Sequence, residues 1–179
     1  MKLKEIVYQV NRDMEEEYEA GDVVQWANRC LDDLTPIAMR EASVQFTIDA
    51  ANSYPLPADF HREAIVLVNG CEYDELQLRD RDGQGYRIWA RNLSLQKGPD
   101  SGTIDLLYYR KLQHMSTTDM EAEPDLEPEY HDLIVLYATG MLQFTEEEYD
   151  RPDALLKYQQ RKEDYRRYIL SLQPPMTMR

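Results

Sequence analysis

Two prolines separated by one residue, Pro55 and Pro57, constrain this chain more than any other feature of its sequence. Each proline ring fixes φ at about −65° and removes a backbone N–H donor, so residues 54–60 must be extended and cannot form a central strand. We expect the Asp59 carboxylate to accept hydrogen bonds from nearby backbone N–H groups in a tight turn, and Phe60 to enter the core. The structural motif of this segment consists of Tyr54, Pro55, Pro57, Asp59 and Phe60.

Strand and hairpin signals surround this motif. Residues 65–68 are apolar and run into Asn69-Gly70, a dipeptide typical of two-residue hairpin turns. Apolar residues between positions 44 and 48 alternate with polar ones, as in a half-buried strand. Short apolar segments separated by polar turns continue toward Arg110. These signals predict a small antiparallel sheet over residues 43–110.

Helical periodicity precedes the sheet. Apolar residues three and four positions apart predict an amphipathic helix over residues 2–18. Asp22 and Gln25 have the spacing of a capping box, which predicts a second helix that stops near Pro36.

Two further helices are expected after the sheet. Residues 130–144 are apolar around most of the helix, as is typical of a buried helix at the centre of a bundle. The last helix is expected to start within residues 150–153, where Pro152 lies, and it carries a stripe of apolar and tyrosine side chains. Between the sheet and these helices, residues 112–127 form a polar connection that we expect to be the least ordered internal stretch.

These elements predict an α+β fold: a helical bundle of two N-terminal and two C-terminal helices with an inserted small antiparallel β-sheet lobe. The expected parts are an N-terminal helical pair (1–42), the β lobe (43–110), a linker and C-terminal helical pair (111–172) and an extended C-terminal tail (173–179).

Charge restricts the function classes. The chain has 34 acidic residues against 20 Lys and Arg, a formal charge of −14. A surface of this sign repels nucleic-acid phosphates, which argues against sequence-specific DNA binding and suits a channel through which DNA slides without sticking. We expect Cys30 and Cys71 to be reduced, partly buried thiols of a cytoplasmic protein. No apolar run is long enough to span a membrane, and the N-terminus lacks a signal-peptide region.

The sequence offers only weak candidates for catalytic or metal-binding residues. Asp59, His61 and Glu63 are close in sequence, but a metal site needs a converging set of ligands, and we read them as a turn followed by a solvated face. The segment Asp80-Arg81-Asp82-Gly83 is similar to a calcium loop, but Arg91 stands where a bidentate glutamate is required. No nucleophile or phosphate-binding signature is present. We therefore expect no catalytic residue, no metal and no cofactor.

Tyrosine is unusually frequent, with 13 residues against 3 Phe. The rings could fill a core and its rim, with their hydroxyls reaching water. They could equally contact other subunits, because Tyr is enriched where proteins meet. The candidates for subunit contact are Tyr158, Tyr165 and Tyr168.

In the order of its parts, the chain resembles the head-to-tail adaptor (connector, or neck) proteins of tailed bacteriophages. The segments that carry this resemblance are Asn-Arg-Cys-Leu-Asp-Asp-Leu (28–34), Tyr-Pro-Leu-Pro-Ala-Asp-Phe (54–60), the hairpin of residues 86–88 and 93–95, residues 107–109, the lead at 126–130 and the helix at 132–138. Lys97-Gly98-Pro99 departs from the simpler hairpin exit of that family.

The resemblance implies a structural virion protein without enzymatic activity. Such adaptors form a homo-oligomeric ring, usually a dodecamer, beneath the portal. The ring extends the DNA channel used in genome ejection and offers a docking platform for tail components. The implied partners are the chain itself, the portal protein, tail or neck proteins and double-stranded DNA that passes without specific binding, with no membrane. The implied location is the virion neck, after assembly in the host cytoplasm.

The resemblance also suggests a role for the end of the chain. The candidate portal-binding residues are Leu170, Leu172, Pro174, Pro175, Met176, Met178 and Arg179, which could become ordered on binding. The alternatives left open are a tail-tube or tail-completion protein, a portal-proximal factor of another fold and, more remotely, a small hydrolase that uses Asp59, His61 or Glu63. An acidic DNA mimic or inhibitor fits the charge but not the ordered layout of helices and sheet.

Overall fold

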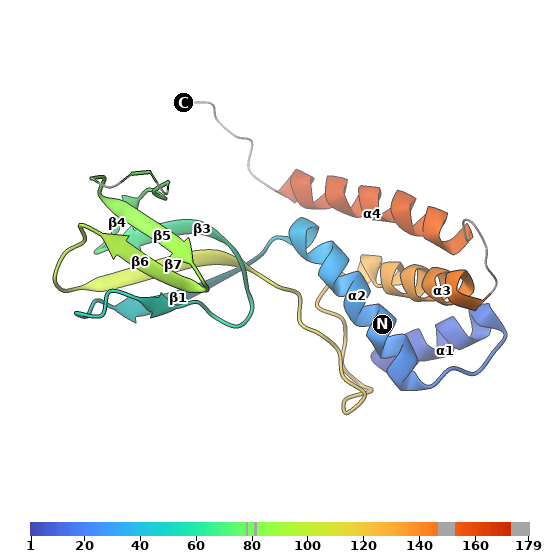
Figure 1. Ribbon diagram of the computed structural model, residues 1–179. Coiled ribbons are helices and arrows are strands. Elements are labelled where there is room, and N and C mark those ends of the chain that lie inside the picture. Colours follow the sequence, from blue (N-terminus) through green and yellow to red (C-terminus); the bar gives the residue numbers. More distant parts are fainter. Residues whose placement is uncertain (78, 81, 147–152, 173–179) are drawn as a thin grey trace. The chain divides into compact units, whose positions relative to one another are not determined.

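The computed structural model describes residues 1–77, 79–80, 82–146 and 153–172. It is an α+β protein, which confirms the predicted fold class. The chain divides into two compact units: Met1–Met39 with Leu112–Arg179, here called the helical unit, and Arg40–Lys111, the β unit (Figure 1). Each helix in the described ranges is too short or too polar to cross a lipid bilayer.

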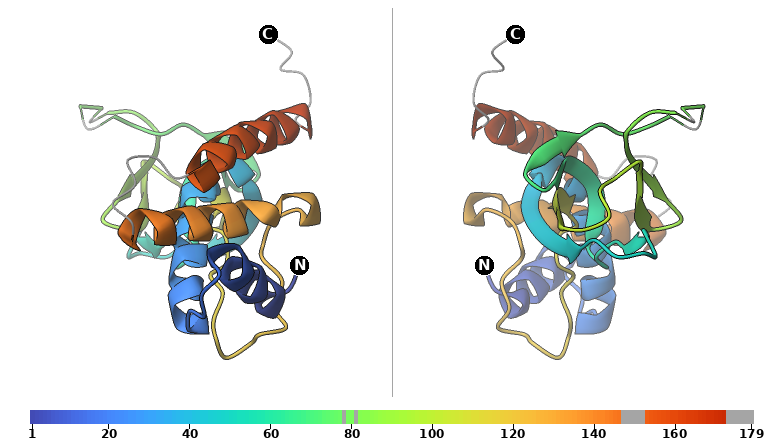
Figure 2. Two further views of the ribbon diagram at one scale, coloured as in Figure 1. Left: turned by 90° about the vertical axis from the view of Figure 1, so that its right-hand side faces the viewer. Right: turned by 90° about the vertical axis from the view of Figure 1, so that its left-hand side faces the viewer.

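The described part of the helical unit is built around α3. Figures 1 and 2 both show α3 between α1 and α4, and α3 contacts each of the other three α-helices. This confirms the prediction that the apolar segment after residue 130 forms the central helix. The helices are α1 (Leu3–Met14), α2 (Ala20–Ala38), α3 (Asp132–Glu146) and α4 (Asp153–Leu172), with the 3-10 turn η1 (Pro128–Tyr130) before α3.

Helix α1 ends at Met14, earlier than the sequence predicts. Glu15 has a left-handed conformation with φ of 57° and caps the helix. It begins a run of three glutamates, and carboxylates at a helix C-terminus are disfavoured by the helix dipole. The Asn11 side chain then hydrogen-bonds both the N–H and the carbonyl of Tyr18. The chain therefore turns where the prediction continued the helix.

Helix α2 starts before its predicted cap and continues past Pro36. Glu19 is the N-cap, so the capping box predicted at Asp22 is wrong. Pro36 lies inside the last turn, although it has no N–H to donate. The turn persists because Ile37 and Ala38 are buried in the core.

The connection over residues 112–127 is anchored, contrary to the prediction that it is poorly ordered. Leu112, Met115 and Leu126 are buried in the helical core. The Asn28 side chain accepts a hydrogen bond from the Met115 N–H at 2.7 Å and donates one to the Met115 carbonyl at 3.0 Å. The polar composition of this stretch therefore concealed three apolar side chains that are buried in the core. It also did not reveal that the Asn28 side chain bonds to the Met115 backbone as a neighbouring strand would.

The same connection also caps the start of α1. The first two N–H groups of α1 donate to the carbonyls of Ala122 and Met120, at 2.9 and 3.0 Å. These groups have no partner inside the helix, so the connection supplies their acceptors. Glu121 accepts hydrogen bonds from Lys2 and Lys4, which lower the pKa of its carboxyl group to about 2.

The strands of the β unit are antiparallel, as predicted, but they divide between two sheets. The proline motif pairs with a late strand and so begins a second layer. The first sheet has the order β1 (Arg40–Thr47), β7 (Thr103–Arg110), β3 (Phe60–Val68) and β4 (Cys71–Tyr73), and the second has the order β2 (Tyr54–Pro55), β6 (Asn92–Gln96) and β5 (Gly85–Trp89).

A buried cluster joins the facing sides of the two sheets. The first sheet contributes Val66, Ile104 and Leu106, and the second contributes Tyr86 and Leu93. In β1 the residues alternate strictly between half-buried and exposed, which confirms the predicted period of two. The outer face of the first sheet therefore remains exposed.

The turn between β3 and β4 is the hairpin predicted from Asn69-Gly70. Both residues have positive φ, 50° and 78°, as a type I′ turn requires. The Asn69 side chain also accepts a hydrogen bond from the Thr103 N–H at 2.9 Å, which ties this turn to β7.

Candidate interaction surfaces

The proline motif joins the two sheets of the β unit. Strand β2 lies at the edge of its sheet, as the prolines predict, and pairs with β6. Just beyond it, the Leu56 N–H donates to the Arg91 carbonyl at 2.9 Å. The Asp59 carbonyl accepts a hydrogen bond from the Lys111 N–H at 2.7 Å, at the end of β7. The motif is thus hydrogen-bonded to both sheets.

The Asp59 carboxylate has a different partner from the predicted one. It accepts a hydrogen bond from the Tyr108 hydroxyl at 3.0 Å, while the turn is closed by the Phe60 N–H, which donates to the Pro57 carbonyl at 3.1 Å. Phe60 is half-buried and lies against the Tyr108 ring. The prediction of backbone donors to Asp59 is therefore wrong, because Tyr108 brings a largely buried hydroxyl that needs an acceptor.

Two of the three tyrosines expected at subunit contacts lie inside the helical unit. Tyr158 and Tyr165 have no exposed surface. Their rings lie against Tyr137 and Tyr130, with centroids 5.1 and 4.9 Å apart. These two residues therefore fill the core and offer no surface to another copy. Tyr168 is half-buried and stays a candidate.

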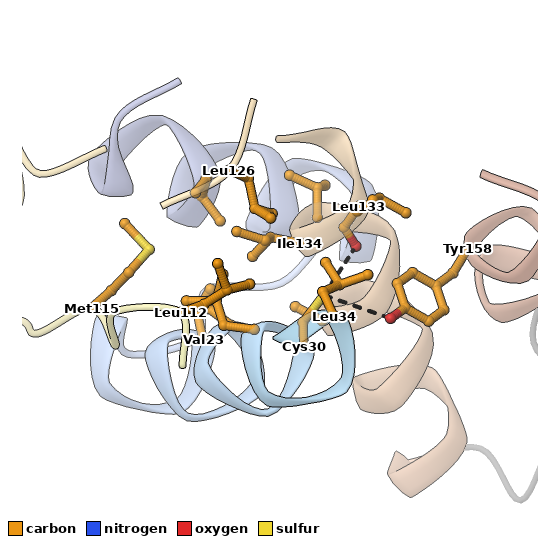
Figure 3. Packing of buried hydrophobic residues seen from close by; sticks show 14 of the residues in the cluster. Val23, Cys30, Leu34, Leu112, Met115, Leu126, Leu133, Ile134 and Tyr158 are labelled. Atoms are coloured by element: carbon orange, nitrogen blue, oxygen red, sulfur yellow. Dashed lines mark hydrogen bonds between the residues drawn. The ribbon is translucent and has the colours of Figure 1, made fainter. Parts of the chain in front are cut away.

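Tyr158 also lies beside a cysteine in the core. Figure 3 shows its hydroxyl directed at Cys30 of α2, at 3.9 Å from Sγ, with the Leu133 carbonyl 3.7 Å from the same sulfur. The hydroxyl donates to Asp33, which also binds Lys162. Burial raises the pKa of both the Cys30 thiol and the Tyr158 hydroxyl. Cys30 is thus a protonated thiol in an apolar setting, unlike a nucleophile.

The structure does not assemble a metal site from the residues it describes. Among these residues, no three His, Cys, Asp or Glu side chains converge as metal ligands. Cys71 lies exposed on β4, whereas the sequence led us to expect a partly buried thiol.

The described part of the predicted portal-binding set lies at the end of α4. Leu170 and Leu172 are both exposed. A groove of about 300 Å³ beside them is lined by Pro36, Ile37, Met39, Arg166, Ile169 and Leu170. The other members of the set, Pro174, Pro175, Met176, Met178 and Arg179, lie outside the described residues.

Charge is distributed unevenly between the two units. The helical unit has 11 Lys and Arg against 23 Asp and Glu, a formal charge of −12. The β unit has 9 against 11, a formal charge of −2. Helix α4 is an exception within the helical unit, with 5 basic and 3 acidic residues. The acidity of the chain is therefore a property of the helical unit.

An exposed tryptophan was not identified from the sequence. Trp89 ends β5 and is 74% exposed. The next two residues, Ala90 and Arg91, both have positive φ, 47° and 61°. The Arg91 guanidinium donates to the Pro57 carbonyl at 3.0 Å, which holds the turn against the proline motif. We call residues 89–92 the Trp89 hairpin. Alternation alone does not show whether the last residue of a strand is buried.

The exposed face of the first sheet contains a groove, also unidentified from the sequence. Its volume is about 700 Å³. Ile65 and Leu107 contribute apolar side chains to it, and Glu41 contributes a carboxylate. We call it the outer-face groove; its lining residues are Glu41, Ala42, Ser43, Glu63, Ala64, Ile65, Leu107, Tyr108 and Tyr109.

Comparison with known proteins identifies a family. A family model described as SU10 adaptor protein matches residues 1–179. No curated protein matches the chain.

Proposed function

The chain belongs to the SU10 adaptor protein family, and from this premise we propose that it forms a ring beneath the portal of a tailed bacteriophage. As a phage adaptor it is a structural protein. In the proposed ring it extends the DNA conduit, provides a platform for tail components and occupies the neck of the virion. The match of one family model to the whole of residues 1–179 is the observation that carries this proposal.

The two-unit architecture supports a ring subunit. The helical unit has a continuous core in which α3 contacts the other helices, and the β unit has a separate core of its own. Each unit can therefore keep its shape while it contacts a different neighbour or partner. Subunits that use two different surfaces form closed rings when the rotation between them closes.

The charge supports passage of DNA without tight binding. Twelve copies at −14 each carry a formal charge of −168. Carboxylates that line a channel repel DNA phosphates within a Debye length, which is about 8 Å at physiological ionic strength. The proposed lumen is thus lined mainly by acidic side chains, and a lumen lined mainly by Arg and Lys would contradict this part of the proposal.

The end of α4 supports attachment to the portal. Leu170 and Leu172 are apolar and exposed next to a groove, and exposed apolar patches on a soluble domain mark interaction sites. We place the portal contact here, together with residues 173–179.

Co-expression with the cognate portal protein tests the proposal. The expected result is a stable complex in which several copies of the chain bind one portal ring, measured by native mass spectrometry. A tail-tube protein would instead bind tail components and would not bind the portal ring.

A further inference from the structure

The Trp89 hairpin has the features of a preformed anchor. Trp89 is the most exposed large hydrophobic side chain among the described residues. The turn after it places two non-glycine residues at positive φ, a conformation that is strained for residues with a Cβ. Such strain persists only where the surroundings impose it. Here the proline motif imposes it, because Arg91 and Leu56 bond across the turn.

The hairpin also lies within a segment of the β unit that has no acidic residue. Residues 83–99 form the longest stretch of the chain without an acidic residue, and they include Arg87, Arg91 and Lys97. In a chain with formal charge −14, this stretch can approach an acidic surface of another copy without repulsion.

The outer-face groove matches the hairpin in shape and charge. Ile65 and Leu107 contribute apolar side chains to it, and a volume of about 700 Å³ accommodates an indole ring. The carboxylate of Glu41, which is exposed on the outer face, can accept a hydrogen bond from the indole N–H and attract Arg91.

The hairpin cannot reach the groove of its own chain. The second sheet, which carries the hairpin, lies against the inner face of the first sheet through a shared buried cluster. The groove lies on the opposite, outer face of that first sheet. The occupant must therefore come from another molecule.

We propose that the Trp89 hairpin of one copy inserts into the outer-face groove of the next copy. The two surfaces differ, so each copy binds one neighbour through its hairpin and another through its groove. Contacts between two different surfaces form a closed ring when the rotation between successive copies closes. The inference rests on the proposed function, since it names the contact that joins subunits in the ring.

Complementation between two variants tests the contact directly. Trp89→Ala removes the anchor and leaves the groove, whereas Leu107→Arg blocks the groove and leaves the anchor. Each variant alone is expected to raise the concentration for half-assembly on the portal by about tenfold or more, because buried tryptophans dominate interfaces. Mixed in equal amounts, the two variants are expected to form pairs, in which Trp89 of the groove variant occupies the groove of the other chain.

Controls separate loss of the contact from loss of the fold. Tyr8→Ala removes an exposed aromatic ring from the helical unit and is expected to assemble as the wild type does. Ser43→Arg blocks the groove at an exposed polar position, so it is expected to reproduce the effect of Leu107→Arg without disturbing apolar packing. Circular dichroism confirms that each variant is folded.

Two outcomes distinguish the inference from the proposed function. Normal rings from Trp89→Ala, with half-assembly at the wild-type concentration, would overturn this inference and leave the proposed function intact. A wild-type chain that neither assembles nor binds the portal would overturn the proposed function, and this inference with it.

Discussion

At the scale of single residues, buried tyrosine hydroxyls make the stability of this chain depend on alkaline pH. Burial raises the pKa of Tyr86 to about 12, with nearby carboxylates adding to the effect. The pKa of Tyr158 is also raised, first by burial. An ordinary tyrosine titrates near pH 10 once the chain is unfolded. A raised pKa in the folded state means that the stability contributed by these groups is present below pH 10 and is lost as the pH rises.

We therefore predict a loss of stability between about pH 10 and pH 12, the interval between the unfolded and folded pKa values of Tyr86. Absorbance of tyrosinate and circular dichroism, recorded together, check this. Titration of Tyr86 near pH 10 with the fold intact would contradict the prediction.

Replacement of glycine by alanine is expected to change the free energy of unfolding in opposite directions at two positions. Gly70 has φ of 78°, where a side chain is strained even though no atom lies within 4 Å of the position that a Cβ would occupy. Gly21 lies in the first turns of α2 with equally open space and no positive φ. We predict that Gly70→Ala lowers the free energy of unfolding by about 1 kcal/mol. Gly21→Ala, the matched control, is expected to raise it by up to about 1 kcal/mol. Urea denaturation measures the free energy of unfolding of both variants. A change of the same sign in the two variants would contradict the strained conformation assigned to Gly70.

At the scale of elements, the connection over residues 112–127 depends on one side chain. Asn28 satisfies both the N–H and the carbonyl of Met115, a residue whose side chain is buried. Asn28→Ala leaves both groups without these partners, and we predict a loss of about 1–3 kcal/mol of unfolding free energy. Gln25→Ala, an exposed change on the same helix, is expected to have little effect. Hydrogen exchange at Met115 should accelerate in the first variant alone, and unchanged protection there would refute the role of Asn28.

The sequence was most informative where local chemistry determines structure. Pro55 and Pro57 exclude a central strand, Asn69-Gly70 requires a type I′ turn, and the apolar α3 is central, because each of these follows from residues close together in the chain. The ends of α1 and α2 were missed because packing and capping override periodicity. The anchoring of residues 112–127 was missed because its partners are distant in sequence.

The same reasoning explains the mixed outcome for the candidate residues. The Asp59 to Tyr108 bond joins positions 49 residues apart, so local rules assign Asp59 a local partner. Tyr158 and Tyr165 follow a helical stripe, and a stripe does not distinguish a core from a subunit contact. Exposure of Trp89 depends on where β5 ends, which the sequence does not specify.

At the scale of the whole molecule, the functions proposed for the ring are assigned to different units. The helical unit carries most of the negative charge and the exposed end of α4, and the β unit carries the Trp89 hairpin and the outer-face groove. DNA repulsion and portal attachment are thus assigned to one unit, and contact between copies to the other.

Removal of residues 173–179 tests the assignment of portal attachment. These residues follow the end of α4, so we predict that the shortened chain unfolds at the wild-type temperature but binds the portal more weakly. Binding is measured by co-sedimentation with the portal. A Leu156→Ala variant, changed at an exposed position near the other end of α4, serves as the control. Unchanged attachment of the shortened chain would refute the role of its tail.

The most direct test of the central claim is a cryo-electron microscopy reconstruction of the virion neck. Density for this chain is expected as a single ring of copies coaxial with the portal, between the capsid vertex and the tail. Placement of the chain in the tail tube, or its absence from the portal vertex, would contradict the account.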